Sequence, residues 1–444
     1  MKKPIPAPSW GALLTQTKPE RFLQLVSTNL SSDTDKKYAH WNDLIHLQPP
    51  SGFSHEEWWL SIKLRRNQQR KPVDALHDDA GKPFQFQITD SILEELHKID
   101  LGGGGHISLP EAVTNPETRN QYYAASLIEE AIRSSQLEGA VTTRQVAKEM
   151  IRTARPPQGR DERMILNNFH AMQSITRLKA DPLTPELIFE LHRIITSDVL
   201  DDSTGPGRLR RADENIVVTD LTDGVLHVPP SAATLPSRLA ALCDFGNGAA
   251  PQGFVHPVIR SIILHFWLAY DHPFIDGNGR VARALFYWSM LHHGYWLCEY
   301  ISISRILRKA PVQYARAFLY TESDDNDLTY FLLYQVDVLK RALRDLHLHI
   351  EESAARAQAL ERTLRGLTLF NHRQRALLGH ALRHPQFRYT IEGHRLSHGT
   401  AYQTARTDLL LLEQKELMRG RKVGRTWFFT PQTDLEKRLE TLPL

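Results

Sequence analysis

Residues 272–283 read HPFIDGNGRVAR, and this stretch decides how the rest of the chain is interpreted. An almost wholly apolar segment, 258–270, precedes it, and the segment 280–290 that follows has apolar residues at helical spacing. Gly277 and Gly279 flank an asparagine, so the backbone between the two segments can take positive φ angles. The stretch therefore predicts a tight turn between two helices, with backbone N–H groups converging at the start of the second.

Such a turn is suited to bind an anion, because N–H groups and the helix dipole both favour negative charge there, and phosphate is the natural guest. Arg280 and Arg283 lie three residues apart, hence on one face of the second helix. Asp276 is placed to hold a divalent cation that bridges phosphate oxygens. His272 can accept a proton near neutral pH. Together these groups predict a phosphate-transfer site; a packed helix-loop-helix turn would explain any one of them but not the combination.

The composition indicates an ordinary globular protein of two or three domains. The chain has 444 residues, of which 41% are hydrophobic and 24% charged, and this excludes disorder as the main state. The net charge is only +3, but residues 366–431 hold eleven Lys and Arg against four Asp and Glu. Basic character is therefore concentrated in one C-terminal module.

The expected location is the cytoplasm. Cys243 and Cys298 lack C-x-x-C spacing, so neither a disulfide framework nor a cysteine zinc site is indicated. Prolines at 4, 6 and 8 interrupt what would be the apolar core of a signal peptide. The most apolar stretch, near 262–270, is far shorter than the roughly 20 residues of a membrane span, so we expect no membrane partner.

Helical spacing dominates the chain, so the predicted fold class is mainly α. We expect a region of uncertain role over 1–110, a core over 111–350, and a linker helix with a further domain over 351–444. Within the core, Thr184 and Pro185 predict the start of a buried helix. Two apolar runs around an Asp-Gly turn predict a β-hairpin between 216 and 228.

The C-terminal module resembles a winged helix-turn-helix. We expect a helix over 374–382, an extended piece at 388–391, a polar turn, a helix over 401–412, and two short strands around a basic turn within 417–429. The 401–412 helix would be the recognition helix and the basic turn the wing. The residues predicted to contact DNA phosphates are Arg406, Arg421, Lys422 and Arg425. Winged helices also bind proteins or dimerise, so the partner stays open.

The 272–283 stretch also resembles the signature of the Fic family, H-x-F-x-[DE]-G-N-[GK]-R-x-x-R, at every fixed position. The resemblance implies a helical core with a β-hairpin flap, and transfer of AMP from ATP to a Ser, Thr or Tyr hydroxyl of a target protein, with release of pyrophosphate. It implies that His272 deprotonates the hydroxyl and that Asp276 binds Mg²⁺. The implied phosphate-binding residues are Gly277, Asn278, Gly279, Arg280 and Arg283, with Arg283 at the γ-phosphate.

A second resemblance lies far upstream. An amphipathic segment, 120–137, ends in SSQLEG at 134–139, where Gly139 is expected to be a left-handed helix cap. A carboxylate at a helix C-terminus costs about 0.3–1 kcal/mol unless a cation offsets it, so Glu138 needs a partner. The stretch resembles the family's inhibitory motif, [ST]-x-x-x-E-[GN]. This implies that Ser134 and Glu138 belong to an inhibitory helix (about 117–139) and that Glu138 pairs with Arg283; a solvated glutamate is the alternative.

In the family the hairpin is a flap that docks an extended target segment. The resemblance implies this docking role for the hairpin residues Ile216, Val217, Val218, Leu226, His227 and Val228. Tyr314 lies where the family often has a tyrosine near the adenine, although a core aromatic fits equally well. The resemblance also implies a homodimer.

Three functions remain open at this point. The first is an autoinhibited protein adenylyltransferase that uses ATP and Mg²⁺. The second uses the same site in reverse, with Glu138 positioning a water to remove AMP from a protein. The third is a DNA-binding regulator whose middle domain responds to nucleotide.

Overall fold

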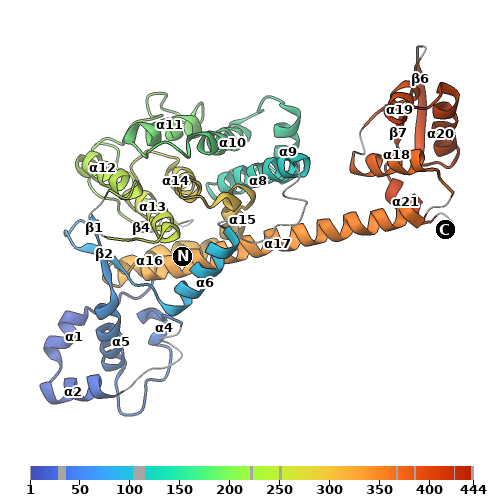
Figure 1. Ribbon diagram of the computed structural model, residues 1–444. Helices are drawn as coiled ribbons and strands as arrows, with labels where there is room; N and C mark the ends of the chain where they lie inside the picture. Colours follow the sequence, from blue (N-terminus) through green and yellow to red (C-terminus); the bar gives the residue numbers. More distant parts are fainter. Residues whose placement is uncertain are drawn as a thin grey trace. The chain divides into compact units, whose positions relative to one another are not determined.

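The structure is a computed structural model and describes residues 2–28, 37–103, 116–220, 224–249, 253–366, 369–384, 387–424 and 426–441 (Figure 1). It is mainly helical, as predicted. The chain divides into two compact units, Met1–His347 and Leu348–Leu444, so the N-terminal region shares a unit with the predicted core. The three-domain division stays a prediction. Within the described residues, no helix combines the length and apolarity that crossing a membrane requires.

The first unit opens with a small helical subdomain and a hairpin. Its elements are α1 (Trp10–Gln16), α2 (Pro19–Ser27), α4 (Trp41–Leu44), α5 (His55–Gln69), the antiparallel strands β1 (Lys71–His77) and β2 (Pro83–Phe86), and α6 (Asp90–Gly103). Ser54 begins α5 with a reciprocal capping box to Glu57. Trp41, Trp58 and Trp59 are buried and form the core of this subdomain.

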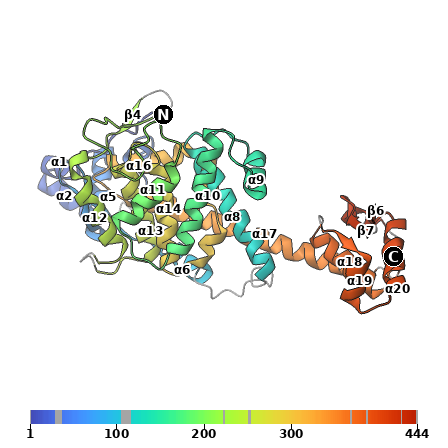
Figure 2. The ribbon, with the colours of Figure 1, turned by 90° about the horizontal axis from the view of Figure 1, so that it is seen from above.

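The rest of the first unit surrounds two central helices. Its elements are α8 (Pro116–Leu137), α9 (Arg144–Thr153), α10 (Arg160–Leu178), α11 (Pro185–Thr196), β3 (Val218–Thr219), β4 (Val225–His227), a 3₁₀ turn (Ala232–Thr234), α12 (Leu235–Gly246), α13 (Pro257–Asp271), α14 (Asn278–His292), a 3₁₀ turn (Trp296–Tyr300), α15 (Ile303–Lys309), α16 (Pro311–Ser323) and α17 (Thr329–Gly366). α13 and α14 lie side by side, with α12 against α13 and with α10 and α11 against α14 (Figures 1 and 2). Both central helices are buried almost all round, which explains why the 258–270 sequence is apolar on every face.

Local signals place the other core elements. The Thr184 hydroxyl accepts a hydrogen bond from the Leu187 N–H and Pro185 is the first residue of α11, as predicted. The predicted hairpin is present but short. Val218 pairs with His227 and Thr219 with Val225, and the register shifts between the two pairs, so Ile216, Val217 and Val228 lie outside the strands.

The second unit contains the end of α17 and a compact set of helices and strands. Its elements are α18 (His372–Arg383), β5 (Tyr389–Thr390), α19 (Ile391–His398), α20 (Tyr402–Gln414), β6 (Met418–Val423), β7 (Thr426–Pro431) and α21 (Leu435–Glu440). The strands form one sheet in the order β5-β7-β6. The predicted helices and hairpin are present, whereas the classification as a winged helix-turn-helix stays a prediction.

One prediction for this unit is wrong. The segment expected to be a polar turn is the helix α19, whose N-terminus is capped by the Thr390 hydroxyl, which accepts from the Gly393 N–H at 3.0 Å. Gly399 ends the helix in the left-handed conformation. Only Ile391 and His394 of α19 are buried, so its sequence lacks the apolar stripe that identifies longer helices.

Buried charges join the N-terminal region to the core. The Lys63 ammonium of α5 lies 2.5 Å from the Asp324 carboxylate in the segment between α16 and α17, and both side chains are completely buried. Burial lowers the pKa of Lys63, and Asp324 opposes that shift. Arg70 pairs with Asp327 beside them. A pair of this kind stabilises little by itself, but breaking it leaves an uncompensated buried charge.

We predict that Lys63→Ala lowers the free energy of unfolding by about 3–5 kcal/mol, because Asp324 loses its nearest buried cation, while Arg70 lies 4.0 Å from its other oxygen. Urea denaturation followed by tryptophan fluorescence measures the loss. The control is Lys98→Ala, which removes a half-exposed lysine paired with Glu94 and Glu95 and should barely move the urea midpoint. Equal midpoints for the two variants would contradict the prediction.

Candidate functional site

The predicted turn between α13 and α14 has two residues in the left-handed region. His272 follows α13 with φ 46°, and its N–H donates to the Leu268 carbonyl. Gly277 precedes α14 with φ 85° and serves as its N-cap. A histidine at positive φ is uncommon, so surrounding contacts must hold this conformation.

Asn278 supplies the first of those contacts. Its side-chain oxygen accepts from the Phe274 N–H and its NH₂ group donates to the Phe274 carbonyl, both at 2.9 Å. The side chain is buried and fully engaged with the turn. If Asn278 contacts a phosphate, it does so through its backbone N–H. This N–H belongs to the first turn of α14 and has no partner within the helix.

His192 and Arg210 hold the turn from outside, and the sequence reasoning missed both. The His192 ring stacks on Phe274 at 3.8 Å between centroids. Its Nδ1 accepts from the Gly207 N–H, so Nε2 carries the proton that is donated to the Asp276 carbonyl at 2.9 Å. Arg210 donates from Nε to the His272 carbonyl at 2.9 Å. The sequence did offer one signal for His192: it stands beside the apolar stripe of a predicted core helix, where a buried histidine needs hydrogen-bond partners.

The His272 imidazole lines a pocket of about 200 Å³. Its Nδ1 lies 3.3 Å from the Ala269 carbonyl, a contact that requires the proton on Nδ1 and leaves the lone pair on Nε2. Burial lowers the pKa of His272 to about 4. The ring is therefore neutral at pH 7 and can accept a proton at Nε2.

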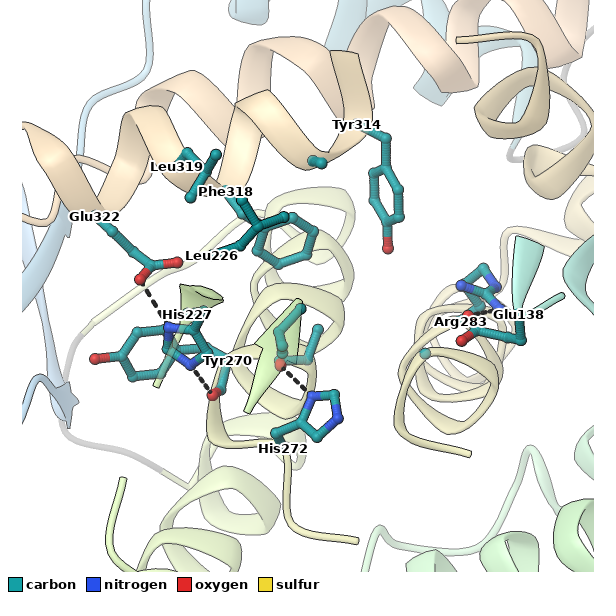
Figure 3. A pocket seen from close by; sticks show the side chains of 14 residues that line it. Glu138, Leu226, His227, Tyr270, His272, Arg283, Tyr314, Phe318, Leu319 and Glu322 are labelled. Atoms are coloured by element: carbon teal, nitrogen blue, oxygen red, sulfur yellow. Dashed lines mark hydrogen bonds and ion pairs between the residues drawn. The ribbon is translucent and has the colours of Figure 1, made fainter. Parts of the chain in front are cut away.

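The structure brings Glu138 to Arg283, as the second motif predicts (Figure 3). Arg283 Nη2 donates to the Glu138 carboxylate at 2.8 Å, and Nε donates to the Ser134 hydroxyl at 2.8 Å. Burial alone would lower the pKa of Arg283, but Glu138 holds it above its usual value. A methyl group added at Gly279 would clash with Glu138 Oε1. The carboxylate thus rests directly against the N-terminal turn of α14, where a phosphate is expected.

Arg280 and Asp276 lie next to each other at the same helix end. Arg280 Nη1 donates to the Ile195 carbonyl at 3.2 Å, and Nη2 lies 3.4 Å from Asp276 Oδ1. Within the described residues its buried Nε has no hydrogen-bond partner. The described part of the chain holds no cluster of three metal-ligating side chains. A single carboxylate nevertheless fits Mg²⁺, which in phosphate sites takes one or two carboxylates and completes its shell with phosphate oxygens and water.

The pocket extends from Arg283 and Glu138 past His272 to Glu322 of α16 (Figure 3). His227 spans its far side: Nδ1 lies 2.8 Å from Glu322 Oε2 and Nε2 lies 2.7 Å from the Tyr270 carbonyl. Tyr314 also lines the pocket, and its hydroxyl lies 2.7 Å from Nε2 of the buried His265.

The six residues expected to dock a target face different ways. Val218, Leu226 and His227 line the pocket, Ile216 is half-buried, and Val217 and Val228 are exposed. Leu226 and His227 are consecutive residues of β4 and both line the pocket, and the docking role of the hairpin stays a prediction. In the second unit, Arg406 of α20 and Arg421 and Lys422 of β6 are exposed, and Arg425 lies outside the described residues.

We predict that the His272 imidazole remains neutral as the pH falls from 8 to 5 and takes up a proton only near pH 4, because burial disfavours the charged form. The proton resonance of its Cε1–H, assigned by comparison with His272→Gln, measures the titration. An unperturbed histidine would titrate near pH 6.5, and that midpoint at His272 would contradict the prediction.

Comparison with known proteins points to one family. Residues 182–290 match the model of the Fic/DOC family. The chain is 25% identical over 205 residues to the protein adenylyltransferase Fic of Nematostella vectensis, covering 46% of this chain and 44% of that protein. It is 33% identical over 113 residues to the protein adenylyltransferase Fic of Drosophila willistoni, covering 26% and 20%. The chain thus spans less than half the length of these relatives.

A solved structure shows the same fold. A Fic family protein from Desulfovibrio desulfuricans G20 superposes with a TM-score of 0.52 at 20% identity, covering 78% of this chain and 97% of that one. The matched segment 182–290 contains α11, the hairpin, α13 and the turn with its signature sequence. Residues 182–290 of this chain are therefore a Fic domain.

Proposed function

We propose that the chain is a protein adenylyltransferase, which moves AMP from ATP to a Ser, Thr or Tyr hydroxyl of a target protein and releases pyrophosphate. The observation that carries the proposal is that one pocket is lined by the neutral imidazole of His272, the first turn of α14 and the buried guanidinium of Arg283. The names of the relatives support the same activity for this chain.

In the proposed reaction Nε2 of His272 takes the proton from the target hydroxyl as its oxygen attacks the α-phosphorus. The bond from the α-phosphorus to the oxygen bridging to the β-phosphate breaks, and its electron pair leaves with pyrophosphate. Arg280, Arg283 and the N–H groups of α14 stabilise the charge that develops on the leaving group. Asp276 would hold Mg²⁺, which neutralises phosphate charge when bound.

The proposal includes autoinhibition by α8. Glu138 forms an ion pair with Arg283 and lies against Gly279. A γ-phosphate bound at this helix end would therefore lie beside a carboxylate. The carboxylate and the γ-phosphate would repel each other at this distance, and Arg283 cannot neutralise both. Displacing Glu138 is therefore expected to free the guanidinium for ATP.

We predict that Glu138→Gly raises AMP incorporation by about tenfold or more, the size of a typical coupling between two sites. Label from α-³²P-ATP, or a gain of one AMP in intact mass, measures it. Glu149→Gly, at an exposed glutamate of α9 that does not line the pocket, is the control for removing an acidic side chain. Adding His272→Ala to Glu138→Gly should cut incorporation by about 10²- to 10⁴-fold while ATP still binds. Equal labelling of wild type and Glu138→Gly would argue against autoinhibition.

The reverse reaction uses the same groups, with Glu138 orienting a water toward an AMP-modified protein. Incubating a modified target with wild type and with Glu138→Gly separates the two directions: release of AMP by wild type alone favours removal. A homodimer and a cytoplasmic location, where Cys243 and Cys298 would stay as the free thiols observed, complete the proposal.

The exposed Arg406, Arg421 and Lys422 favour DNA as a second ligand, bound by the C-terminal unit. We predict that the full chain retards duplex DNA and that binding weakens as salt rises. Arg421→Ala with Lys422→Ala should lower the slope of log affinity against log salt by about 2, roughly one for each lost phosphate contact. Lys98→Ala, in the first unit, should leave the slope unchanged. Salt-independent retardation, or none, would reject DNA binding.

A further inference from the structure

Arg160 places a further guanidinium at the edge of the turn and, like Arg210, is not included in either motif. Arg160 is the first residue of α10, and its Nη2 lies 3.6 Å from Asp276 Oδ2. Its Nε donates to the Val199 carbonyl at 3.1 Å. The Arg160 side chain is 58% exposed, compared with 0% for Arg280 and 2% for Arg283. Arg160 is therefore by far the most exposed of the three arginines.

The two oxygens of Asp276 are used differently. Oδ1 accepts from the Gly277 N–H and lies 3.4 Å from Arg280 Nη2. Oδ2 faces Arg160. The backbone carbonyl of Asp276 is fixed by His192, so the residue is held in place at both its main chain and one carboxylate oxygen. Oδ2 is thus the oxygen available to a new ligand, and Arg160 is the group that competes for it.

A divalent cation at Oδ2 would compete with Arg160 for that oxygen. Mg²⁺ would bind at about 2.0–2.1 Å from a carboxylate oxygen. At Oδ2 it would lie within roughly 6 Å of the Arg160 guanidinium that faces the same oxygen. The two cations repel, and Asp276 is fixed while Arg160 is exposed. We therefore expect Arg160, the exposed partner, to be the group that moves, and the nucleotide phosphates that accompany the metal are the new negative charge with which it can pair.

We propose that Arg160 is an exchange residue, an inference that rests on the proposed function. Without nucleotide it neutralises Asp276, and when a divalent cation takes Asp276 it transfers to the nucleotide phosphates as a third guanidinium. The arginine thereby couples metal binding to nucleotide binding. The exchange concerns only Oδ2, because Arg280 Nη2 lies 3.4 Å from Oδ1 of the same carboxylate.

The chain offers a matched control. Arg163 lies one turn along α10, where its Nη1 donates to Asp198 Oδ2 at 3.0 Å. Like Arg160 it is a partly exposed arginine near the start of this helix with a carboxylate partner, but that partner is not Asp276. Arg163→Ala therefore reproduces the loss of charge and of an ion pair without touching the turn.

The experiment measures the affinity of α,β-methylene-ATP for the full chain carrying Glu138→Gly, by calorimetry, with excess Mg²⁺ and with EDTA. We expect Arg160→Ala to weaken binding about tenfold with Mg²⁺, the size of one charge-assisted phosphate contact, and less than about twofold in EDTA. Arg163→Ala should change neither. Arg160→Gln, which keeps the length of the side chain, should behave as Arg160→Ala.

A second readout uses Mn²⁺ alone, followed by its electron paramagnetic resonance signal. Arg160→Ala should bind Mn²⁺ several-fold more tightly, because the competing cation at Oδ2 is gone. Equal losses of nucleotide affinity with and without the cation, or no loss in either, would overturn the exchange. If neither the Glu138→Gly parent nor its Arg163→Ala derivative binds the analogue, the proposed function fails instead.

Discussion

The site depends on one constraint: the chain must pass from α13 to α14, two buried helices packed side by side, within six residues. Residues with positive φ at both ends of the turn make this possible, and one of them, His272, is not glycine. The amide of Asn278 closes the turn on Phe274, and His192 and Arg210 hold its backbone from α11 and from the segment before the hairpin. The same fixed backbone presents the imidazole to the pocket and the N–H groups of α14 to a phosphate.

The proposed inhibitory contact, between Glu138 and Arg283, also has one rigidly held partner. Arg283 is buried and held by the Ser134 hydroxyl and carbonyl as well as by Glu138, so it cannot turn away from α8. Glu138 is the more exposed partner of the pair. In the proposed account activation is therefore a movement of the glutamate, not of the arginine. Asp276 and Arg160 repeat the arrangement, with a fixed residue facing an exposed one across an ion pair.

Sequence reasoning predicted what is encoded locally. The turn at 272–283, the helix that ends at Leu137 beside Glu138 and the start of α11 each depend on glycines, caps or apolar spacing within about a dozen residues, and all are present. The pairing of Glu138 with Arg283 followed from a family motif and not from local signals. His192, Arg210 and Arg160 were missed because each acts on a turn that lies far away in the sequence, and nothing next to them indicates that contact. The helix α19 was missed for the opposite reason, since its few buried residues give too weak a pattern.

The most direct test of the central claim is a crystal structure of the Glu138→Gly chain with α,β-methylene-ATP and Mg²⁺. The account predicts the triphosphate on the N-terminus of α14, with the γ-phosphate against Arg283 and the α-phosphorus beside Nε2 of His272, leaving room for a hydroxyl oxygen at about 3–3.5 Å. A nucleotide bound elsewhere, or an imidazole whose Nε2 faces away from the α-phosphate, would contradict it.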